Sequence, residues 1–111
     1  MNKEETWGEI KEYLYSLNFL DFDFFHMVVI ARLKKMYASY TYGGAPHNSK
    51  ETNAKISHQL AHLLDINAQI EYLRETTDYT PKKEKHLFAM FYSYLGKHIT
   101  EWHDWSDNDD N

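Results

Sequence analysis

The chain has 111 residues, of which 42% are apolar and 26% charged, and this length and composition predict one globular domain. It contains no cysteine, which excludes disulfides, zinc–thiolate sites and thiol catalysis. The formal net charge of −5 argues against direct nucleic-acid binding, because that binding depends on neutralising phosphates. An acidic protein suits a protein partner with a basic surface instead.

The start of the chain lacks the basic-then-apolar pattern of a signal peptide. The longest apolar run, residues 22–33, contains Asp23, His26 and Arg32 and is too short to cross a bilayer. We therefore expect a cytoplasmic protein that makes no membrane contact.

Aromatic residues are abundant, with nine Tyr, six Phe and three Trp. Each buried ring removes about 150–250 Å² of surface from water, so a compact core is within reach. A domain this small has little room to bury every ring, and we expect the surplus at an interface.

The first predicted helix covers residues 3–17. Asn2 is its expected N-cap, with Glu5 in the capping-box position. An apolar stripe recurs at steps of three and four residues, formed by Trp7, Ile10, Leu14 and Leu17. The opposite face carries the acidic residues Glu5, Glu9 and Glu12.

The second predicted helix covers residues 22–40 and ends before Gly43 and Gly44. Its main stripe consists of Phe22, Phe25, Val29, Leu33, Met36 and Tyr40, and Phe24, Val28 and Ile30 cover other sides. A helix that is apolar nearly all round is usually the most buried one, and we expect that here.

The third predicted helix covers residues 49–75, capped by Asn48 or Ser49. Its stripe consists of Ile56, Leu60, Leu63, Leu64 and Ile70. At about 1.5 Å per residue it would be about 40 Å long, which is long for a small bundle, and we expect a kink at residues 65–67.

The fourth predicted helix covers residues 81–105 and begins with Thr80 as cap and Pro81 at the first helical position. Its stripe consists of Phe88, Phe91, Leu95, Trp102 and Trp105. Together the four patterns predict an all-α fold, a small antiparallel bundle of four main helices. Residues 1–105 form the expected single domain, and residues 106–111 an acidic, flexible tail.

Histidines are the first candidates for chemistry. His58 and His62 lie one helical turn apart, a spacing that can present two imidazoles to one metal ion. They project away from the apolar stripe, and Gln59 stands where a zinc-protease motif has its glutamate. A solvated polar face is the simpler interpretation, so we predict no metal, and a His-ligated metal protein remains the third functional alternative.

His26 and His98 instead lie within apolar faces of their helices. The pattern predicts core or interface histidines, each satisfied by one hydrogen bond. For His98 the alternative is a pH-sensitive contact, because an unperturbed histidine titrates near about pH 6.5.

Residues 37–46 combine three tyrosines with a glycine pair. Such tyrosines commonly finish a helix and pack on the core, but they can also stack on a base or a small ligand. A small-ligand or nucleotide-binding protein that uses Tyr40, Tyr42, His47 and nearby lysines is therefore the second functional alternative.

The chain has no nucleophile elbow, no P-loop and no dinucleotide-binding glycine motif. We expect neither enzymatic activity nor a cofactor. Two acidic surfaces remain as candidates for a partner site: Glu5, Glu9 and Glu12 near the start, and Glu101, Trp102, Asp104 and Trp105 near the end.

Aromatic anchors supply affinity at such surfaces, and acidic residues steer the encounter. The profile is typical of small non-catalytic proteins that inhibit or sequester a partner, such as toxin-immunity proteins, antitoxins and phage anti-defence inhibitors. The stripe of the fourth helix could also pair two copies of the chain, so a homodimer is a further expectation.

Overall fold

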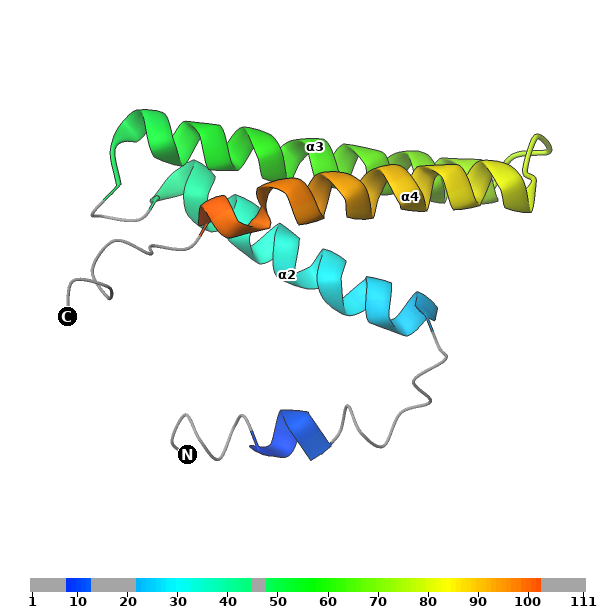
Figure 1. The fold of residues 1–111 in the computed structure, drawn as a ribbon, viewed down its shortest axis with the longest axis horizontal. Coiled ribbons are helices and arrows are strands. Elements are labelled where there is room, and N and C mark those ends of the chain that lie inside the picture. Colours follow the sequence, from blue (N-terminus) through cyan, green and yellow to red (C-terminus); the bar gives the residue numbers. More distant parts are fainter. Residues whose placement is uncertain (1–7, 13–21, 45–47, 103–111) are drawn as a thin grey trace.

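The computed structural model describes residues 8–12, 22–44 and 48–102. Within these ranges the chain forms α-helices and one 3₁₀ turn and no strand (Figure 1). The helices pack against one another as a small all-α bundle, which confirms the predicted fold class. Residues 8–12 are helical and fall inside the predicted first helix. The rest of that helix and the predicted tail, residues 106–111, lie outside the described residues.

Helix α2, Phe22–Tyr42, ends at a turn that requires glycine. The backbone N–H groups of Gly43 and Gly44 both donate to the carbonyl of Ser39, at 3.0 and 2.6 Å. Gly44 has φ +74°, and a Cβ placed there would clash with the side-chain amide of Asn53. A side chain would therefore be strained by backbone conformation and by contact. The helix continues two residues beyond the predicted end, so Tyr42 belongs to its last turn.

Helices α3, Lys50–Arg74, and α4, Pro81–His98, begin where local capping chemistry places them. The Ser49 hydroxyl accepts from the N–H of Thr52, and the Thr80 hydroxyl accepts from the N–H of Lys83, both at 3.1 Å. Helix α3 runs without interruption through residues 65–67, where we expected a kink.

After α4 the chain tightens into the 3₁₀ helix η1, Ile99–Trp102, whereas the sequence pattern predicted an α-helix as far as Trp105. Side-chain bonds of Glu101 and Trp102 to α3, described below, hold the chain in this tighter turn. Residues 103–105 lie outside the described part of the chain.

Helix α3 is the centre of the packing, and α2 and α4 both lie against it (Figure 1). It contributes seven buried residues, whereas α2 contributes three. The expectation that α2 is the most buried helix is therefore wrong. Its apolar residues point to more sides than its neighbours cover. The buried apolar core consists of Ile30, Leu33, Ile56, Leu60, Leu63, Ile66, Ile70 and Phe91.

No helix within the described ranges has the length and apolar character needed to cross a membrane.

Candidate binding surfaces

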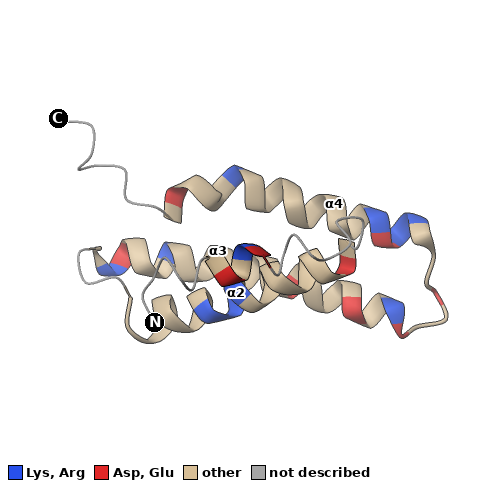
Figure 2. Ribbon diagram, turned by 90° about the horizontal axis from the view of Figure 1, so that it is seen from below, with Lys and Arg blue, Asp and Glu red and all other residues tan. Residues whose placement is uncertain are grey.

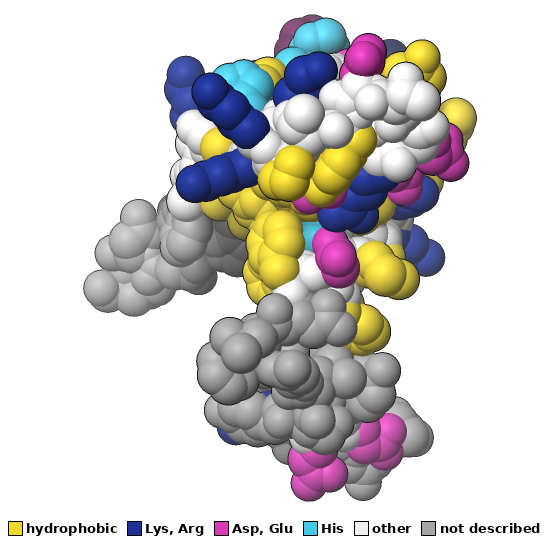
Figure 3. Space-filling model, turned by 90° about the vertical axis from the view of Figure 1, so that its right-hand side faces the viewer, with side chains coloured by type: hydrophobic (Ala, Val, Ile, Leu, Met, Phe, Trp, Pro, Cys, Tyr) yellow, Lys and Arg dark blue, Asp and Glu magenta, His cyan; other side chains and the backbone are white. Residues whose placement is uncertain are grey.

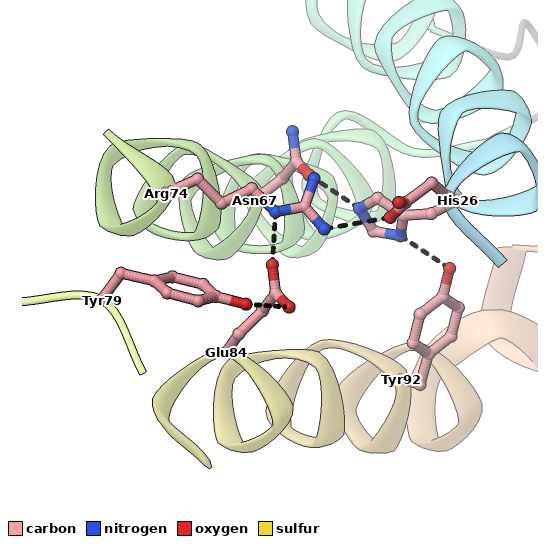
Figure 4. A network of polar contacts seen from close by, with 7 residues as sticks. His26, Asn67, Arg74, Tyr79, Glu84 and Tyr92 are labelled. Carbon is pink, nitrogen blue, oxygen red and sulfur yellow. Dashed lines mark hydrogen bonds and ion pairs between the residues drawn. The ribbon is translucent and has the colours of Figure 1, made fainter. Parts of the chain in front are cut away.

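A buried histidine joins the three long helices. His26 of α2 lies between Asn67 of α3 and Tyr92 of α4 (Figure 4), with ring nitrogen to oxygen distances of 2.7 Å on both sides. The Asn67 oxygen can only accept, so Nε2 carries a hydrogen, and in the neutral ring Nδ1 accepts from the Tyr92 hydroxyl. Burial raises the pKa of Tyr92 to about 12, which keeps this donor protonated.

This arrangement occupies both ring nitrogens of His26 with other side chains. The sequence predicted a core histidine with one hydrogen bond, and the structure gives two. The network is therefore best understood as a structural link, which fixes the register of three helices around one polar group.

A second network surrounds Arg74 at the end of α3 (Figure 4). Its guanidinium pairs with Glu84 of α4 and, at 3.0 Å, with Asp23 of α2, and Tyr79 donates to Glu84 at 3.0 Å. The hydrogen bond to Glu84 is the largest cause that raises the pKa of Arg74, and the guanidinium also lies 5.6 Å from the ring centre of Phe88. Arg74 and Asp23 are exposed and Glu84 is half-buried, so the pairs position helix ends more than they stabilise the fold.

Two residues predicted for the C-terminal part of the partner site, Glu101 and Trp102, make hydrogen bonds within the chain. Trp102 donates its indole N–H to the Gln59 side-chain oxygen at 2.8 Å, and Gln59 donates to Glu101 at 3.2 Å. Glu101 also pairs with His98 at 2.8 Å and Lys55 at 3.1 Å. The hydrogen bond from His98, followed by those from Gln59 and Lys55, lowers the pKa of Glu101 to about 2.

These contacts give Glu101 and Trp102 a structural role, and their role toward a partner stays a prediction. Of the other residues predicted for the partner site, Glu9 and Glu12 are exposed on the short helical segment 8–12. Glu5, Asp104 and Trp105 lie outside the described residues.

The tyrosine-rich turn lines a groove of about 530 Å³, which we call the Tyr groove. Tyr40 and Tyr42 of α2 line it together with Lys50 and His58 of α3. The structure thus brings two predicted ligand residues together with His58, which the sequence singled out for a different reason. His47, the third predicted ligand residue, lies outside the described part of the chain.

His58 and His62 both point away from the core and are exposed. The ring of His62 packs at 4.4 Å from that of Tyr94, which lies at the same distance from His98. In the described ranges, no group of three or more His, Cys, Asp or Glu residues is placed to hold a metal ion. The pair therefore lacks a third ligand there.

Sequence reasoning missed a half-exposed aromatic cluster where α2 begins. Phe22 packs edge-on against Phe88 and Tyr92 at 5.0 and 5.8 Å, and Phe25 lies 6.4 Å from Tyr92. Phe25 is 57% exposed and Met27 is 65% exposed. Figure 3 shows hydrophobic side chains gathered at this end of the molecule. The signal was the all-round apolar character of the helix, which we took as a sign of burial.

Comparison with protein-family models, with curated proteins and with solved structures gives no match to this chain.

Proposed function

We propose that this chain is a small non-catalytic binding protein that inhibits or sequesters a protein partner. The observation that carries the proposal is the exposed apolar surface of α2, formed by Phe22, Phe25 and Val28 at steps of three residues, which we call the α2 surface. Large rings that are fixed by their neighbours and open to solvent on one side are typical interface anchors, because they lose little freedom on binding.

Charge supports a partner with a basic surface. The chain carries a net charge of −5, with six acidic against two basic residues in positions 1–23. Glu9 and Glu12 of this stretch are exposed. Opposite charge on the partner speeds the encounter, and the apolar contact then sets the lifetime of the complex. Toxin-immunity proteins, antitoxins and phage anti-defence inhibitors are the types of protein that this combination fits best.

The test is affinity capture from the source organism with three forms of the protein. The wild type and Tyr72→Ala, which removes an exposed ring from α3, should capture the same partner. The double variant Phe25→Ala/Val28→Ala should lose it while keeping the helical circular dichroism spectrum. Capture that is equal for all three forms contradicts a partner site on the α2 surface.

Sedimentation of the purified protein separates a foreign partner from a second copy. If the α2 surface serves a foreign partner, the wild type and the double variant should sediment with the same mass, whether or not the stripe of α4 pairs two copies. A wild-type dimer that the double variant converts to monomer would show that the α2 surface joins two copies, and the proposal of a foreign partner at this surface would then be wrong.

The Tyr groove supports a second candidate function, the binding of a small ligand such as a nucleotide. Its support is the meeting of Tyr40 and Tyr42 with Lys50 and His58 around one concavity. Calorimetry with a nucleotide panel tests it, because Tyr42→Ala removes a ring that is 85% exposed and should weaken binding without affecting the fold. Unchanged affinity in that variant would exclude this groove.

A further inference from the structure

A second groove, of about 430 Å³, lies where the later turns of α2 approach η1. Arg32, Lys35 and Ser39 line it from α2, and the rings of Tyr40 and Trp102 complete it. We call it the Arg–Trp groove. It shares Tyr40 with the Tyr groove, whereas Arg32, Lys35 and Trp102 line only the Arg–Trp groove.

The two cations of this groove are unusual for so acidic a chain. Arg32 and Lys35 are exposed, stand one helical turn apart and form no ion pair with another described residue. Figure 2 shows basic residues of this part of α2 along the helix. The described residues that line the groove include no carboxylate. The positive charge inside it is therefore not neutralised by its own walls.

Hydrogen bonds within the chain hold the ring of Trp102 in place without a ligand. The indole N–H of Trp102 is used by Gln59 at 2.8 Å, and Gln59 is itself buried and held by Glu101. With its one donor occupied, Trp102 offers only ring surface to the groove. A ring already held in place loses little entropy when a second ring stacks on it.

We propose that the Arg–Trp groove binds a planar aromatic anion of the size of a nucleoside monophosphate. The base stacks on Trp102, and the phosphate lies between Arg32 and Lys35, where the guanidinium can donate two parallel hydrogen bonds. The groove volume lies within the usual range for such ligands. The proposal does not rest on partner binding by the α2 surface.

Calorimetry of the full chain with adenosine monophosphate, adenosine and inorganic phosphate tests the proposal. The monophosphate should bind at least about tenfold more tightly than either fragment, because it alone engages both the ring and the cations. Arg32→Ala and Lys35→Ala should each weaken it about tenfold, since each removes one charge-assisted contact. Both side chains are exposed, so these variants should keep the fold.

Lys34→Ala is the matched control, because Lys34 is an exposed base on the same helix that does not line the groove. It should leave the affinity unchanged. Equal losses of affinity in Lys34→Ala and Arg32→Ala would show that only the overall charge of the chain matters, and would overturn the proposal. Binding lost in Tyr42→Ala alone, or no heat with the monophosphate at millimolar concentration, would also overturn it.

Discussion

Phe91 and Phe25 carry the same side chain on different helices, and their surroundings differ completely. Phe91 of α4 is 0% exposed and belongs to the core with Leu60 and Leu63 of α3. Phe25 of α2 is 57% exposed, and its ring centre lies 6.3 Å from that of Phe22 and 6.4 Å from that of Tyr92. Phe91 therefore belongs to the core contact between α3 and α4, which we call the seam, whereas the start of α2 presents apolar surface outward. Burial around Phe91 stabilises the fold, whereas the start of α2 leaves apolar surface in contact with solvent.

The largest expected effect is on the seam. Phe91→Ala should lower the free energy of unfolding by about 3–5 kcal/mol, because it removes a fully buried ring and leaves a cavity among well-packed neighbours. Urea denaturation followed by circular dichroism measures the change. If the variant does not fold, Phe91→Leu gives a milder version of the same test. A loss below about 1 kcal/mol in Phe91→Ala would show that the seam is not the core.

The next effect concerns the polar link between the seam and α2. Tyr92→Phe removes the hydroxyl that faces His26 Nδ1 and leaves a buried ring nitrogen unpaired. We expect a loss of about 1–2 kcal/mol in unfolding free energy. Tyr94→Phe is the control, because the Tyr94 hydroxyl has no hydrogen bond to another described side chain. Similar losses in both variants would assign the effect to the loss of any tyrosine hydroxyl, whatever its partner, and contradict the link.

A contact of the fold could be predicted from the sequence when its two residues lie close together along the chain. The starts of α3 and α4 follow from Ser49 and from Thr80 with Pro81, because a cap bonds to a backbone group three residues away. The buried stripe of α3 follows from periodicity. By contrast, His26 meets Tyr92 across 66 positions and Trp102 meets Gln59 across 43. Such pairs depend on how the helices pack, which no local pattern contains.

The exposure of α2 was missed for a related reason. Periodicity shows that a residue is apolar but not how many neighbours its helix will have. Phe25 and Val28 belong to an apolar pattern as complete as that of Leu60 and Leu63, and only the packing around α3 separates the two. For the same reason, Glu101 looked like a free surface acid, although it closes a network with His98 and Lys55.

That network gives a pH-dependent prediction at the end of the seam. The pKa of Glu101 falls from 4.5 to about 2 in the folded chain, mainly through the hydrogen bond from His98. A folded-state pKa below the unfolded one means that the carboxylate stabilises the fold above about pH 4.5, and that this contribution disappears as the pH falls toward 2. The difference in unfolding free energy between wild type and Glu101→Gln should therefore shrink over this window.

Glu75→Gln, which neutralises an exposed carboxyl at the end of α3, serves as the control for that titration. Its difference from wild type should stay small at every pH. If Glu101→Gln differs from wild type equally at about pH 6 and at pH 2, the carboxylate contributes nothing through its charge, and the network would hold Trp102 through Gln59 alone.

The smallest expected effect is on the α2 surface, and it completes the comparison with Phe91. Phe25→Ala should lower the unfolding free energy by about 1 kcal/mol or less, because the ring is 57% exposed and packs loosely against its aromatic neighbours. Urea denaturation under the conditions used for Phe91→Ala measures it. A loss close to that of Phe91→Ala would mean that another segment or a second copy buries Phe25 in solution. The surface would then already be occupied, and a foreign partner would have to displace that contact before it could bind.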